Sequence, residues 1–239
     1  MSRNRLAGVA LALAAALVAA APVCGQATVH YPQHALTAPG AVGQQQLLRG
    51  GPLAGHFQPV EILGPEGMRV SIAEKDGFSD PVAAPLNVGM LIGQVYRIKV
   101  TQIPRNAGAE VFPTIEVVNR LYPPPGQKTR FPIPVELTRE ELEMALSGKL
   151  VTRVIYLEAP KAAIPNRQLG RQPYYEILGT QDPLQVADGL GRPVAILRMG
   201  SRMPDATGPN DAFLFGCPPL TRLPPSASVP ALLESRKAM

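Results

Sequence analysis

Residues 95–121 read VYRIKVTQIPRNAGAEVFPTIEVVNRL and contain two stretches in which apolar and polar side chains alternate. The apolar positions of these stretches are Tyr96, Ile98, Val100, Ile115 and Val117. An apolar residue at every second position turns one face of a strand toward a core and the other toward water. The run Pro-Arg-Asn-Ala-Gly between the two stretches is typical of a turn. The sequence therefore predicts two neighbouring antiparallel strands, over residues 95–103 and 114–121.

Patterns on both sides of this pair predict further strands. Residues 68–72 alternate in the same way, and 131–137 fit an edge strand, because its two prolines lack the N–H that an inner strand must donate. Residues 150–158 (LVTRVIYLE) are apolar on both faces apart from Thr152 and Arg153, which predicts a central strand. Two more strands are expected, at 174–178 and 194–199.

Two short helices are indicated by their first residues. Thr138 and Glu141 fit a capping box, in which the hydroxyl accepts from the Glu141 amide and the carboxylate reaches back, and this helix should end at Gly148. Asp182, followed by a proline, predicts a second helix that ends at Gly189. The expected fold is all-β, or β-rich α+β: an antiparallel β-sandwich of immunoglobulin-like or transthyretin-like type with one or two short helices.

The N-terminus has the features of an export signal. Two arginines precede an unbroken apolar run over residues 6–23, and the small residues that follow suit cleavage after Ala27, with Gly25 as the second choice. A retained anchor helix is the alternative, since the run is near the lower length limit for crossing a bilayer. Lipidation at Cys24 is disfavoured, because a valine rather than a small residue precedes it.

The rest of the chain divides into three segments. Residues 28–58, rich in glycine, alanine, glutamine and proline, are predicted to form a flexible linker. Residues 59–203 form the β-rich domain, and 204–239 a proline-rich irregular tail in which residues 213–215 (FLF) could dock on the domain. After removal of the signal, no stretch is long and apolar enough to cross a membrane.

Composition weighs against nucleic-acid binding and against a reactive or disulfide-bonded cysteine. The formal charge of +5 comes from scattered residues, and no dense Lys/Arg run carries interleaved aromatic residues, so nucleic-acid binding is not expected. Of the two cysteines, Cys24 leaves with the signal, so Cys217 has no disulfide partner. Cys217 stands in a proline-rich stretch without a nearby base and is interpreted as an inert thiol.

Residues able to carry catalysis or hold a metal are sparse. All three histidines lie in or beside the predicted linker, and neither a Gly-x-Ser-x-Gly nor a His-Glu-x-x-His motif occurs. His30 and His34 could share a metal only on a helix, which Pro32 opposes, so neither a metal site nor a cofactor is predicted. Arg153 is the one weak candidate for binding. It could be the buried partner of a carboxylate or a binding residue, although arginines near strand ends more commonly reach solvent along their alkyl stem.

Two blocks of the chain carry a resemblance. Residues 112–158 (FPTIEVVNRLYPPPGQKTRFPIPVELTREELEMALSGKLVTRVIYLE) and residues 182–200 (DPLQVADGLGRPVAILRMG) resemble a group of uncharacterised signal-peptide proteins from planctomycete bacteria. The resemblance implies an exported bacterial protein whose core domain spans both blocks. It implies no catalytic residue, since that group carries no assigned activity.

Three functions are left as hypotheses. The first is an exported, non-enzymatic module of the cell envelope, a β-sandwich that binds or supports another component; ligand and partner are not predicted. The second is a hydrolase or carbohydrate-active enzyme, which requires carboxylates distant in sequence to converge in one pocket. The third is a metal-binding protein that uses His30 and His34.

Overall fold

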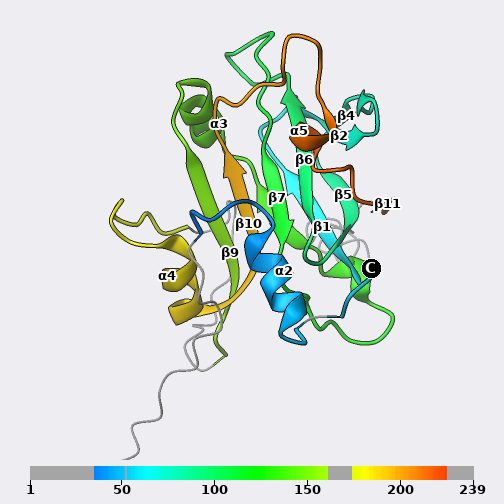
Figure 1. Ribbon diagram of the computed structural model, residues 1–239, viewed down its shortest axis with the longest axis vertical. Helices are drawn as coiled ribbons and strands as arrows, with labels where there is room; N and C mark the ends of the chain where they lie inside the picture. Colours follow the sequence, from blue (N-terminus) through cyan, green and yellow to red (C-terminus); the bar gives the residue numbers. More distant parts are fainter. Residues whose placement is uncertain (1–34, 52, 161–173, 225–239) are drawn as a thin grey trace, which may run out of the picture. The chain divides into compact units, whose positions relative to one another are not determined.

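Two β-sheets make up the body of the computed structural model, which describes residues 35–51, 53–160 and 174–224 (Figure 1). All of these residues belong to one unit, residues 31–239. Within the described ranges the fold has 11 strands and a few short helices, so the predicted β-sandwich is confirmed. Whether its type is immunoglobulin-like or transthyretin-like stays a prediction. The described helices include none with the length and apolar character needed to span a bilayer.

The first sheet has four strands in the order β11–β5–β1–β8. Its strands are β1 (Phe57–Leu63), β5 (Leu86–Leu91), β8 (Ile133–Glu136) and β11 (Leu220–Arg222). As its prolines predict, β8 lies at the sheet edge. It runs parallel to β1, unlike the antiparallel pairs β1–β5 and β5–β11. The long connection from the second sheet, which includes the 3-10 turn η1 (Lys128–Arg130), brings it into this direction.

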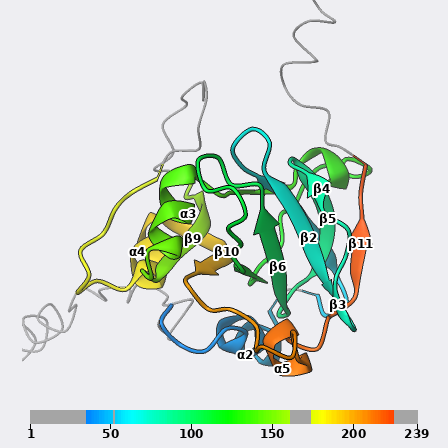
Figure 2. The same cartoon turned by 90° about the horizontal axis from the view of Figure 1, so that it is seen from above.

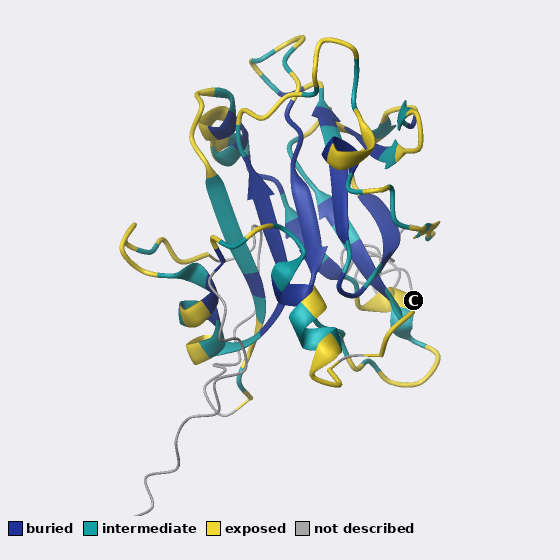
Figure 3. Cartoon of the chain, in the orientation of Figure 1, coloured by how far each residue is buried: buried dark blue, intermediate teal, exposed yellow. Residues whose placement is uncertain are grey.

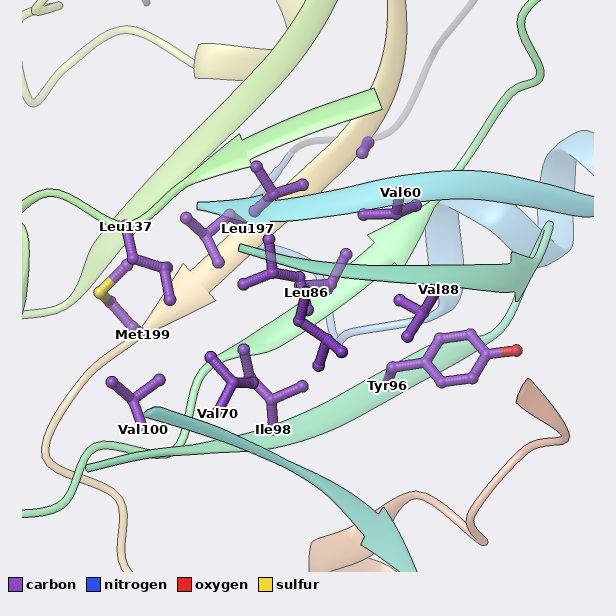
Figure 4. Close-up of a cluster of buried hydrophobic side chains, with 14 of the residues drawn as sticks. Val60, Val70, Leu86, Val88, Tyr96, Ile98, Val100, Leu137, Leu197 and Met199 are labelled. Carbon is purple, nitrogen blue, oxygen red and sulfur yellow. The ribbon is translucent and has the colours of Figure 1, made fainter. Parts of the chain in front are cut away.

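The second sheet has the order β3–β2–β6–β7–β10–β9, with β4 beside β2. Its strands are β2 (Arg69–Glu74), β3 (Gly77–Phe78), β4 (Val82–Ala83), β6 (Val95–Thr101), β7 (Thr114–Val117), β9 (Val151–Glu158) and β10 (Gly191–Met199). β6 and β7 are antiparallel neighbours, with Tyr96 opposite Ile115, as the alternation predicts. Side chains of both sheets, among them Val60, Val88, Ile98 and Leu197, form the main core (Figure 4).

The place of β9 differs from the prediction. The apolar character of both its faces predicts a central strand, yet β9 is the last strand of its sheet and β10 holds the inner position. Figure 3 shows β10 mostly buried and β9 at intermediate burial. Helices supply the cover that a neighbouring strand was expected to give: α3 (Arg139–Leu146) and α4 (Pro183–Leu190) both pack against β9. The prediction of a strand at 174–178 is also wrong, because these residues are irregular and mostly exposed.

Both predicted helices are confirmed at their N-termini. The Thr138 side chain accepts from the Glu141 amide, and the Glu141 carboxylate accepts from the Thr138 amide at 3.1 Å, which completes the capping box of α3. The Asp182 carboxylate accepts from the Leu184 amide at 3.2 Å and caps α4. α4 ends at Leu190, one residue beyond the predicted Gly189.

Part of the predicted flexible linker is folded. Helix α2 (Ala41–Leu48) lies within it, and Ala35 and Val42 are buried. The sequence did not predict this helix, because its apolar residues form no continuous face. The helix packs through its backbone instead. A Cβ added to Gly43 would stand only 2.7 Å from the Gly93 Cα. The backbone of α2 and the backbone at Gly93 therefore approach as closely as glycine allows. Residues 28–34 and 52 of the linker lie outside the described residues.

A buried ion pair on the outer face of the second sheet holds this segment. Arg198 Nη1 donates to Glu116 Oε2 at 2.7 Å, and the Glu116 carboxylate is fully buried. Both residues also bond the N-terminal segment: Glu116 Oε1 accepts from the Gly43 amide at 2.8 Å, and Arg198 Nε donates to the Ala35 carbonyl at 3.2 Å. The pair therefore anchors residues 35–43 to β7 and β10.

The predicted irregular tail also contains structure. α5 (Asp211–Leu214) and β11 belong to it, and the suggested docking of its aromatic residues is confirmed by the burial of Phe213. Arg97 makes the contact: its Nε donates to the Phe213 carbonyl at 3.0 Å, and its guanidinium carbon lies 4.5 Å from the Phe213 ring centre. Burial, and to a smaller degree the charge of Arg202, lowers the pKa of Arg97 to about 10. Residues 225–239 lie outside the described ranges.

We expect that breaking the buried pair from one side destabilises the protein strongly. Arg198→Met leaves the Glu116 carboxylate buried without its counter-charge, which should lower the free energy of unfolding by about 3–5 kcal/mol. The double variant Glu116→Gln with Arg198→Met removes both charges and should recover part of that loss. Urea unfolding of Arg198→Met, Glu116→Gln and the double variant measures the three losses, and a double-variant loss equal to the sum of the two single losses would contradict the coupling.

Candidate functional site

A groove follows the free edge of β9 and is the main candidate site. It has a volume of about 690 Å³. Its lining comes from four segments: α3, residues 150–158, residues 174–177 and α4. We call it the β9 groove. In Figure 2, α3 and α4 lie beside β9, away from β11.

The edge of β9 is open because β9 pairs only with β10 among the described strands. Every second residue of an edge strand directs its N–H and C=O away from the sheet. The helices stand on opposite sides of this edge. Leu142 of α3 belongs to the main core together with Ile155, whereas Leu184 of α4 packs with Ile196 on the outer face of the sheet. The groove thus has a backbone floor and a helix on each flank.

Arg153 lies in this groove and is the partner of a carboxylate, the first of the two roles considered for it. Its Nη2 donates to Glu141 Oε2 at 2.7 Å and to the Glu136 carbonyl. The two charged side chains are only 13% and 16% exposed. Since Glu141 also completes the capping box, Arg153 connects the start of α3 to β9. It shapes the groove, and its charge is neutralised within it.

Carboxylates from separate segments line the groove. Glu140 and Glu141 come from α3, Glu158 ends β9, and Glu176 lies in the irregular segment 174–178. A glycosidase needs two carboxyl groups about 5–9.5 Å apart. Glu141 is held by Arg153, and the backbone of Glu158 lies five residues beyond that of Arg153, roughly 17 Å along the strand. This backbone separation does not favour Glu141 and Glu158 as such a pair.

Aromatic and aliphatic side chains give the groove an apolar character. Tyr174 and Tyr175 are 60% and 69% exposed, and Leu157 and Leu190 are partly exposed beside them. Burial, together with the neighbouring Tyr175 and the negative charge of Glu158, raises the pKa of the Tyr156 hydroxyl. Tyr156 is therefore a neutral hydrogen-bonding group at physiological pH.

The other residues that the sequence singles out lie elsewhere. His30 and His34 are outside the described residues, which contain no group of three or more His, Cys, Asp or Glu placed to hold a metal ion. Cys217 is a free, partly buried thiol. Burial, and then the charges of Asp211, Glu74 and Asp76, raise its pKa, which favours the unreactive protonated form.

Comparison with known proteins identifies no relative. No protein-family model matches the chain, and the searches of curated proteins and of solved structures found no match either. Within the described residues, the fold and the groove define a β-sandwich in which the edge strand β9 lies in a groove lined by two helices.

We expect Arg153 of β9 to contribute more to stability than Arg139 of α3, whose ion pairs are more exposed. Arg153→Ala should lower the free energy of unfolding by about 1.5–3 kcal/mol, because it leaves the partly buried Glu141 without its charged partner. Arg139, whose ion pairs with Glu140 and Glu143 are exposed, is the matched control, and Arg139→Ala should cost at most about 0.5 kcal/mol. Equal losses in thermal unfolding would show that Arg153 is no anchor.

Proposed function

We propose that the chain is an exported, non-enzymatic envelope protein that binds an extended polypeptide along the open edge of β9. The observation that carries this proposal is the edge of β9, which no described strand pairs with, at the floor of a groove with helices on both flanks. An extended segment placed there would continue the sheet through main-chain hydrogen bonds. Alternate side chains of the added strand would face α3 on one side and α4 on the other.

The charges of the groove favour a basic ligand. Glu158 and Glu176 line it, while Glu140 pairs with Arg139 and the positive charge of Arg153 is balanced by Glu141. Tyr175 and Leu190 offer apolar contact between these carboxylates. A segment that alternates basic and apolar side chains matches both features. Glycans could also stack on exposed tyrosines, but an open strand edge gives them no matching backbone partner.

Export is supported by the N-terminal pattern, in which two arginines, an apolar run and a small residue at position 27 follow in order. A non-enzymatic role is supported by the state of the charged side chains in the groove and, outside it, by the state of the Cys217 thiol. Arg153 and Glu141 are engaged with each other and with α3, and the thiol of Cys217 has a raised pKa. None of these groups is poised as a nucleophile or base.

Expression of the full chain in a Gram-negative bacterium tests export. We expect the periplasmic form to begin at Thr28, which N-terminal sequencing and intact mass would detect. Ala27→Arg should block cleavage, because signal peptidase requires a small residue at that position. A mature form that begins at Met1 would contradict the proposed cleavage.

Binding is tested with a soluble peptide of alternating valine and lysine. It should bind and slow hydrogen exchange of residues 151–158, and replacement of Glu158 and Glu176 by lysine should weaken binding at least about tenfold, because repulsion replaces attraction. The matched control replaces the exposed Glu66 and Asp80 by lysine, which changes net charge equally outside the groove. An equal loss in both variants, or binding of oligosaccharides but not of the peptide, would refute the proposal.

A further inference from the structure

A second cluster of functional side chains lies on the opposite side of β10 from β9. The Arg120 guanidinium carbon stands 4.1 Å from the centre of the Tyr122 ring, and that of Arg192 stands 5.2 Å from the same ring. Arg192 Nη1 also donates to the Arg120 carbonyl at 2.9 Å. One tyrosine ring therefore holds two guanidinium groups close together. Tyr122 and Arg192 line an open pocket of about 500 Å³ together with Asn119 and Gln46.

The charge of Arg120 also acts on two more basic side chains. Lys128 and His56 both have lowered pKa values, caused first by burial; the charge of Arg120 contributes to both, and that of Lys128 contributes to His56. Because its pKa is lowered, His56 is mainly neutral at physiological pH, so the positive charges here are those of Arg120, Lys128 and Arg192. Repulsion among like charges destabilises a folded surface unless something offsets it.

No protein group offsets this charge in the described part of the chain. No ion pair or side-chain hydrogen bond joins Arg120 or Lys128 to an acidic residue there, and neither residue has further partners. The buried Nε of Arg120 lacks an acceptor. Within the described residues, the Arg192 side chain donates to the Arg120 carbonyl alone. Arg192 lines the pocket, and Arg120 shares the Tyr122 ring with it, so two guanidinium groups with free donors stand at this pocket.

We propose that the cluster formed by Arg120, Tyr122, Lys128 and Arg192 binds a phosphate group. Guanidinium groups present paired N–H donors that match the oxygens of a tetrahedral oxyanion, and their contact with an aromatic ring fixes the plane of each fork. The lysine adds a point charge without strict geometry. A bound phosphate would offset the repulsion among Arg120, Lys128 and Arg192. The proposal is independent of the β9 groove, since it shares no residue with it.

The mature full chain is titrated with three probes at constant ionic strength. The probes are inorganic phosphate, phosphatidylglycerol vesicles and phosphatidylcholine vesicles. Binding of inorganic phosphate would identify a small soluble phosphate as the source, and binding of phosphatidylglycerol vesicles alone would identify a lipid headgroup; either result supports the proposal. Binding of none of the probes, or equal binding of both kinds of vesicle, overturns it.

Variants locate the site. Arg192→Gln and Lys128→Gln should each weaken binding about tenfold, the effect expected for one charge-assisted contact. Lys128→Gln removes no described side-chain contact, so it tests the proposal even if Arg192→Gln impairs folding. Arg222→Gln, an exposed arginine of β11, is the matched control and should leave binding unchanged. A loss in the control as large as in Lys128→Gln would mean that net charge alone attracts the probe, and would overturn the proposal.

Discussion

The buried ion pair between Glu116 and Arg198 is the interaction on which the periphery of this fold depends. Two charges on the outer face of a sheet are tolerated there only because they neutralise each other and find further partners. The N-terminal segment supplies those partners, the Gly43 amide and the Ala35 carbonyl. The Ala35 amide in turn donates to Asp182 at 2.9 Å, and Asp182 caps α4. The ion pair is thus connected by hydrogen bonds to the helix that forms one flank of the β9 groove.

Two other arginines of the second sheet hold outlying segments in the same manner. Arg97 binds α5 through the Phe213 carbonyl and through ring contact, and Arg153 binds the first turn of α3. In each case a long side chain from a strand satisfies groups at the end of a short helix. These helices are too short to be stable alone. Their positions, and therefore the shape of the groove, follow from where the arginines stand on the sheet.

The predictions from sequence succeeded where the signal is local. The capping residues Thr138 and Asp182 and the alternation around Tyr96 each depend on neighbours within a few positions. The edge position of β9 and the folding of α2 depend on contacts distant in sequence, which periodicity does not report. Arg198 and Glu116 were missed because a charged residue in an alternating strand is ordinarily solvated. Arg153 was recognised as a candidate, but its partner Glu141 was assigned only to the cap. Arg120 and Arg192, which share the Tyr122 ring, are 72 positions apart in the sequence, and no sequence motif joins them.

The open margin of β9 has a cost as well as a use. A strand with free main-chain groups can pair with the same strand of another copy and so begin aggregation. In this protein the margin is bordered by Glu158 and Glu176. Two such margins brought together would oppose negative charge to negative charge. The same carboxylates that would attract a cationic segment therefore also discourage self-association. One pair of side chains thus favours a basic ligand and opposes aggregation.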